Sequence, residues 1–117
     1  MKTTAIATFL STPGTSAILR EATRAIATGV VRAESPCKAI GLACETLGAS
    51  DELLEVALLA FNEIAVTTSR PCETWWGYAW MQLVLECTAA RGEVGIAMAD
   101  VLLASRRLDT LQRPARS

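Results

Sequence analysis

The sequence predicts an all-α protein: a compact bundle of about five helices in a single domain, preceded by a short N-terminal arm. Three observations support this fold class. Apolar residues recur at the three- and four-residue spacing of amphipathic helices over most of the chain. Glycine, proline and helix-capping residues divide that pattern into segments of helical length. No segment sustains an apolar–polar alternation between hairpin turns, so a strand is an alternative only for a short piece such as residues 5–10.

The predicted arm covers residues 1–14 and ends in Thr-Pro-Gly, which is a turn signal. It is either extended or briefly helical. Its apolar side chains, Ile6, Phe9 and Leu10, need a surface to pack on. They either cover the core of their own domain or reach a partner, and we include Phe9 among the candidate interface residues.

The domain covers residues 15–117, and its first two helices are defined by their ends. The first, residues 15–33, begins with a threonine and a serine that can cap it. The second, residues 36–47, has Pro36 in the first helical position. Gly48 follows this helix and can adopt the left-handed conformation that ends a helix. The residues predicted to point inward are Leu19, Ala22, Ile26, Val30, Cys37, Ile40, Gly41, Cys44 and Leu47.

The three later helices follow from the same kinds of signal. Ser50 caps the helix over residues 51–68, which stops before a Ser-Arg-Pro run. The fourth helix, residues 72–91, ends at Gly92, and the fifth covers residues 93–108. The residues predicted to point inward are Leu54, Ala57, Leu58, Phe61, Ile64, Ala65, Cys72, Trp76, Ala79, Trp80, Leu83, Cys87, Val94, Ala97, Met98, Val101, Leu102 and Leu108.

Composition argues against several classes of function. The 117 residues include no histidine, which is the commonest general base and metal ligand. No phosphate-binding glycine motif follows a predicted strand. We therefore expect no enzymatic activity, no cofactor and no metal site. The net charge of −1 lacks the basic field that nucleic-acid binding usually needs, so we expect no direct contact with nucleic acid.

The expected environment of the protein is the cytoplasm. No apolar run approaches the roughly 18 residues needed to span a bilayer, so we expect no membrane association. The four cysteines all lie on predicted inner helix faces, where free thiols behave as small hydrophobic groups. Buried free thiols fit a reducing compartment better than a set of disulfides does.

Apolar residues make up 51% of the chain and charged residues only 20%, which leaves an excess of apolar surface. The helix over residues 72–91 has a second apolar face opposite its core stripe, and its two neighbours each carry two further apolar residues seven positions apart. Either the fold buries these second faces, or they form interfaces with a homodimer partner, another protein, or both. The candidate interface residues are Trp75, Tyr78, Met81, Leu85, Leu59, Val66, Ile96, Leu103 and Phe9.

The block from Thr74 to Met81, Thr-Trp-Trp-Gly-Tyr-Ala-Trp-Met, and the layout of residues 15–108 resemble the QslA-like quorum-sensing anti-activators. The resemblance implies a short, helical, dimeric protein that binds the ligand-binding domain of a LuxR-type transcription factor and blocks its activation. It carries over no individual functional residue.

Two other functions fit a small helical chain. An immunity or anti-defence protein would block a toxin or nuclease, although many such proteins are strongly acidic and this chain is close to neutral. A small-ligand carrier would hold its ligand between helices, in an apolar pocket lined by Phe61, Trp76 and Trp80.

Overall fold

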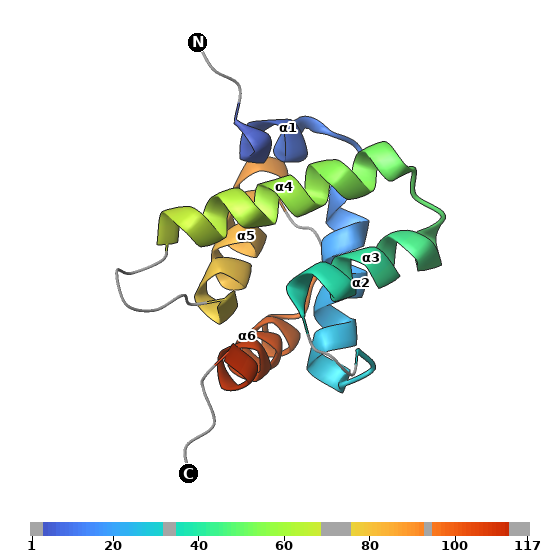
Figure 1. Cartoon of the computed structure of the whole chain (residues 1–117). Helices are drawn as coiled ribbons and strands as arrows, with labels where there is room; N and C mark the ends of the chain where they lie inside the picture. The colour runs from blue at the N-terminus through green and yellow to red at the C-terminus, as the bar shows by residue number, and fades with distance from the viewer. Residues whose placement is uncertain (1–3, 32–34, 69–75, 93–94, 113–117) are drawn as a thin grey trace.

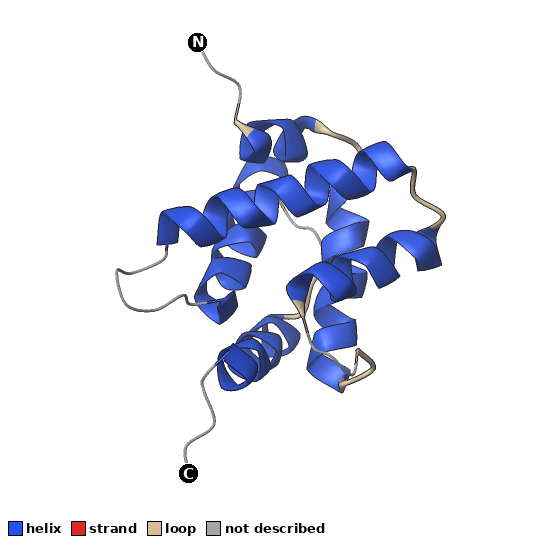
Figure 2. Cartoon of the chain, viewed as in Figure 1, coloured by secondary structure: helices blue, strands red, loops and turns tan. Residues whose placement is uncertain are grey.

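The computed structural model describes residues 4–31, 35–68, 76–92 and 95–112. Within these ranges the chain forms six helices and no strand (Figure 2). The prediction of an all-α bundle is therefore confirmed, with one helix more than expected because part of the predicted arm is helical. The helices are α1 (Ala5–Ser11), α2 (Thr15–Thr28), α3 (Pro36–Leu47), α4 (Asp51–Thr68), α5 (Trp76–Arg91) and α6 (Met98–Gln112).

The helices pack around α5 and α2. Helix α5 contacts α4, α6 and α1, while α2 contacts α3 and α6. In Figure 1, α1 lies at the top, α4 crosses the front of the molecule and α6 lies at the bottom. The radius of gyration is 13.5 Å, the value expected of a compact globule of this length.

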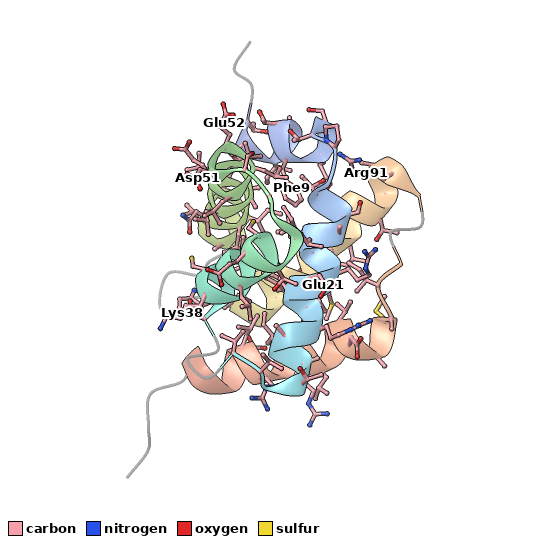
Figure 3. The ribbon with its side chains drawn as sticks, turned by 90° about the vertical axis from the view of Figure 1, so that its right-hand side faces the viewer. Phe9, Glu21, Lys38, Asp51, Glu52 and Arg91 are labelled. Carbon is pink, nitrogen blue, oxygen red and sulfur yellow. The ribbon has the colours of Figure 1, made fainter. Side chains whose placement is uncertain are left out.

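The N-terminal arm contains a docked helix, α1. The Thr4 hydroxyl accepts a hydrogen bond from the Ala7 N–H at 3.0 Å, and the Glu63 carboxylate of α4 accepts one from the Ala5 N–H at 2.9 Å. These two acceptors satisfy N–H groups that the first turn of a helix leaves unpaired. Phe9 points from α1 into the interior and is fully buried (Figure 3). Our inclusion of Phe9 in a partner interface was therefore wrong, because its side chain belongs to the core of its own chain.

Glycines set two of the three helix ends that the sequence analysis misplaced. The third is the end of α6, which lies at Gln112 rather than at residue 108. Helix α2 ends at Thr28, earlier than predicted, because Gly29 adopts a left-handed φ of 75°. Helix α6 begins at Met98, later than predicted, and Gly95 before it also has a positive φ of 75°. The predicted bounds of α3 and α4 are confirmed. The first turn predicted for the fourth helix, residues 72–75, lies outside the described residues.

The largest buried side chain, Trp80, joins three helices at the centre of the core. Its ring packs against Phe61 of α4, with the centroids 5.7 Å apart and the planes inclined at 54°. Its indole N–H donates to the Thr23 hydroxyl of α2 at 3.0 Å. Both polar atoms are buried, so each satisfies the other where water has no access.

Several residues predicted to point inward are exposed instead. Val30 follows the end of α2, so it no longer shares the helical face that buries Ile26. On α6, Met98 and Leu102 lie on a side that no other described helix covers. The other residues corrected in this way are Cys37, Leu47 and Ala97. Helical periodicity identified the buried stripe of these helices but overestimated its width.

Candidate protein-binding faces

Helix α5 has two apolar faces, and the structure separates them. The inner face is buried and consists of Ala79, Trp80, Leu83, Val84 and Cys87. On the outer face, Tyr78 is 54% exposed and Leu85 is 44% exposed. We call the outer residues the α5 face: Tyr78, Gln82, Leu85, Glu86 and Ala89.

Contacts at both ends of α5 hold this face toward solvent. At the N-terminal end, the Gly77 N–H donates to the Asp109 carboxylate of α6 at 2.9 Å. A Cβ atom on Gly77 would lie 2.2 Å from the Ser105 carbonyl oxygen, so the two backbones touch. At the C-terminal end, the Arg91 guanidinium donates to the carbonyl oxygen of Thr12, between α1 and α2 (Figure 3). Rotation of α5 to bury Tyr78 would break these contacts.

The other two candidate residues predicted on this helix are Met81 and Trp75. Met81 is half-buried and packs against the core, so it is at the edge of the α5 face rather than within it. Trp75 lies outside the described residues.

Helix α4 carries two further candidate interface residues, and both face solvent. Leu59 and Val66 are both exposed. The same side of the helix carries Glu52, Glu55 and Asn62, also exposed. We call these five residues the α4 face. Asn62 separates Leu59 from Val66 along it, so it is not a continuous apolar patch.

Helix α6 exposes more apolar surface than predicted. Leu103 is exposed as expected, whereas Ile96 is half-buried and packs against the core. The sequence analysis missed Met98 and Leu102, which are 53% and 48% exposed. Their spacing offered a signal, because apolar residues at positions i, i+1, i+4 and i+5 produce an apolar arc wider than a single core stripe. We call the exposed arc the α6 face: Met98, Ala99, Leu102, Leu103 and Arg106.

The α6 face lies at the edge of the molecule. Figure 3 shows α6 along the lower border, with the C-terminal end of α2 crossing in front of it. The contacts of α6 agree with this view, since its main neighbours are α5 and α2. The buried residues Val101, Ala104 and Leu108 face those helices.

Among the described residues, a shallow groove lies between α2 and α3. Its volume is about 150 Å³, below the roughly 300 Å³ at which small-molecule sites usually begin. Two of the three residues that would line the pocket suggested by the sequence, Phe61 and Trp80, are buried and pack against each other. The groove is lined by Glu21, Arg24, Ala25, Val30, Leu42, Ala43 and Thr46.

Three of the four thiols lie in the described part of the chain, and none of these three forms a disulfide. Cys44 and Cys87 are buried, Cys37 is exposed, and Cys72 lies outside the described residues. Burial raises the pKa of the Cys44 thiol, which disfavours the reactive thiolate. The described part of the chain contains no group of three or more histidine, cysteine or carboxylate side chains placed to hold a metal ion. Likewise, none of its helices combines the length and apolarity needed to cross a membrane.

No family model matches the sequence, and neither the curated proteins nor the solved structures include a significant match to the chain.

Proposed function

We propose that this chain is a small protein-binding regulator that inhibits a larger protein by direct contact, and that its target is a LuxR-type transcription factor of a quorum-sensing system. Two kinds of observation support the proposal. The exposed apolar side chains of α4, α5 and α6 suit protein contact. The resemblance of the Thr74–Met81 block to QslA-like anti-activators suggests the target. Such a regulator would act in the cytoplasm, where its target works.

The observation that carries the proposal is the exposure of Tyr78 and Leu85 on one face of a helix whose opposite face is the centre of the core. Tyrosine is enriched among the residues that contribute most to binding at protein interfaces. Complete burial of a leucine contributes about 1.5–3 kcal/mol, so covering the exposed half of Leu85 contributes about 1 kcal/mol. Two such anchors on a rigid helix provide a preorganised contact.

The polar residues on the α5 and α4 faces fit a reversible contact. Gln82 and Glu86 lie beside the two anchors on α5. On α4, Glu55 and Asn62 lie on either side of Leu59. Interfaces between proteins that are also stable apart are about as polar as ordinary protein surface. An inhibitor that must release its target needs a surface of this mixed kind.

The test measures binding to the ligand-binding domain of a LuxR-type regulator encoded in the same genome. The double variant Tyr78→Asp/Leu85→Asp places two charges in the contact. We expect at least a 30-fold rise in Kd, which corresponds to about 2 kcal/mol and to the loss of one interface hot spot. In cells, the variant should fail to repress a reporter gene driven by that regulator.

Val30→Asp is the control, because it places a negative charge at an exposed apolar position in the groove between α2 and α3, outside the α4 and α5 faces. It should bind and repress like the wild-type chain. Absence of binding by the wild-type chain would reject the LuxR-type target. Wild-type affinity of the double variant would reject the α5 face as the contact, and loss of its helical circular dichroism would assign that face to the core.

A further inference from the structure

The charged residues of the chain are unevenly distributed, although its net charge is only −1. Helix α4 carries four carboxylates and no lysine or arginine, and α1, which packs on it, has no charged residue. The other two helices packed on α4, α3 and α5, each carry one carboxylate and one basic residue, so they do not offset its charge. The side of the molecule that α4 forms is therefore acidic.

The α4 face has the spacing of a helix-packing stripe. Glu52 and Glu55 are followed along it by Leu59, Asn62 and Val66, at alternating intervals of three and four residues. Such a repeat is the one along which a second helix packs. The stripe is about 21 Å long at the usual helical rise, which is about four turns of a second helix. Figure 1 shows α4 crossing the front of the molecule with no other described helix over it.

The stability of α4 itself does not account for the acidic end of this stripe. A carboxylate in the first turn, such as Glu52, interacts favourably with the helix dipole. Glu55 lies beyond the first turn, four residues after Asp51 and three after Glu52. Like charges at these spacings destabilise a helix. The free chain thus keeps a repulsion that a positively charged partner would relieve.

We infer that the α4 face binds a basic amphipathic helix of the target protein. Lysine or arginine side chains of that helix face Glu52 and Glu55, and its apolar side chains pack on the exposed parts of Leu59 and Val66. Asn62 lies within the apolar half, where a single polar residue fixes the register of two packed helices. The inference rests on the proposed function for the protein that supplies this helix, and it adds the chemistry by which that protein is recognised.

A synthetic peptide tests this chemistry without the LuxR-type protein. The probe is an amphipathic peptide of about 18 residues, long enough to form a helix, with leucines along one half of its packing face and lysines along the other. We expect the amide NMR resonances of the α4 face to shift when this peptide is titrated into the full chain. A peptide with glutamate in place of lysine should leave them unchanged. Equal shifts with both peptides, or shifts confined to other helices, would overturn the inference.

Glu52→Gln/Glu55→Gln removes the charge of the face and keeps its shape. We expect about a fivefold rise in the Kd for the lysine peptide at low salt. The difference from the wild-type chain should vanish at about 1 M salt, where the Debye length is about 3 Å. Glu21→Gln/Asp100→Asn is the matched control, because it makes the same change in net charge on α2 and α6. An unchanged Kd in the first variant, or an equal rise in the control, contradicts the inference.

Leu59→Gln/Val66→Gln tests the apolar half of the stripe with residues that suit a helix. The Kd for the lysine peptide should rise about tenfold at low and high salt alike, because burial of apolar surface is not screened by ions. Circular dichroism should show the same helix content as in the wild-type chain, since both side chains are exposed. A Kd that did not rise would mean that the apolar half makes no contact, and the inferred packing would be wrong.

The same variants, measured against the ligand-binding domain of the LuxR-type regulator, separate this inference from the proposed function. If the wild-type chain does not bind the domain, the target is rejected, and the peptide titration still decides what the α4 face binds. If the wild-type chain binds the domain and Glu52→Gln/Glu55→Gln binds it with the same Kd and salt dependence, the target stands and the inference fails.

Discussion

Trp80 and Tyr78 lie two residues apart on α5 and occupy opposite environments. Trp80 is fully buried, packs on Phe61 and donates its indole N–H to Thr23. Tyr78 is more than half exposed. Both are large aromatic residues, so hydrophobicity alone does not tell the inner side of this helix from the outer side. The small residues do, because Gly77 and Ala79 let the neighbouring helices approach the buried side closely.

The largest expected effect on stability comes from replacing Trp80, on the inner side of α5, by alanine. The substitution removes the biggest side chain in the core and leaves the buried Thr23 hydroxyl without its donor. We expect a loss of about 4 kcal/mol in the free energy of unfolding, measured by urea titration. Leu85→Ala, on the outer face, should cost less than about 1 kcal/mol, since the side chain is already half in water. Similar losses for the two variants would remove the distinction between the faces.

The second test concerns the contact between α5 and α6. Gly77→Ala places a methyl group against the Ser105 carbonyl, so the two helices must move apart. Overpacking against backbone should lower the free energy of unfolding by about 3 kcal/mol. Gly41→Ala in α3 is the matched control, because a Cβ there meets nothing within 4 Å. The control should gain about 0.5–1 kcal/mol from the better helix propensity of alanine. A harmless Gly77→Ala would show that α5 is free to shift, and the outward orientation of Tyr78 would then no longer be fixed.

Glycine positions show which parts of the fold the sequence could and could not predict. The ends of α3 and α4 were predictable because their signals are local: Pro36 starts one helix, Gly48 ends it, and Ser50 precedes the next. The different roles of Gly29 and Gly77 could not be predicted from local signals. Gly29 ends a helix in a left-handed conformation, whereas Gly77 lies within a helix and packs closely on a neighbouring helix. That choice depends on packing between segments that are distant in the sequence.

The candidate site was predictable to a similar extent. Tyr78 and Leu85 lie on the exposed side where the sequence analysis placed them, because a second apolar face on one helix is visible in its own periodicity. Phe9 and Met98 were assigned the wrong environments, since burial there depends on how many neighbours a helix has. Helix α1 is docked on α4, whereas α6 lies at the edge of the molecule.

The smallest expected effect lies at the N-terminal end of α5. The Asp109 carboxylate accepts the Gly77 N–H and places negative charge at the positive end of the α5 dipole. Asp109→Ala removes both contributions and should lower the free energy of unfolding by about 1 kcal/mol. Asp109→Asn keeps an oxygen acceptor and loses only the charge, so its cost should be about 0.5 kcal/mol. Glu86→Gln, on the outer face of the same helix, should leave the urea midpoint unchanged. If Asp109→Ala matched Glu86→Gln, the capping contact would contribute nothing, and the close packing of Gly77 on Ser105 alone would hold this end of α5 in place.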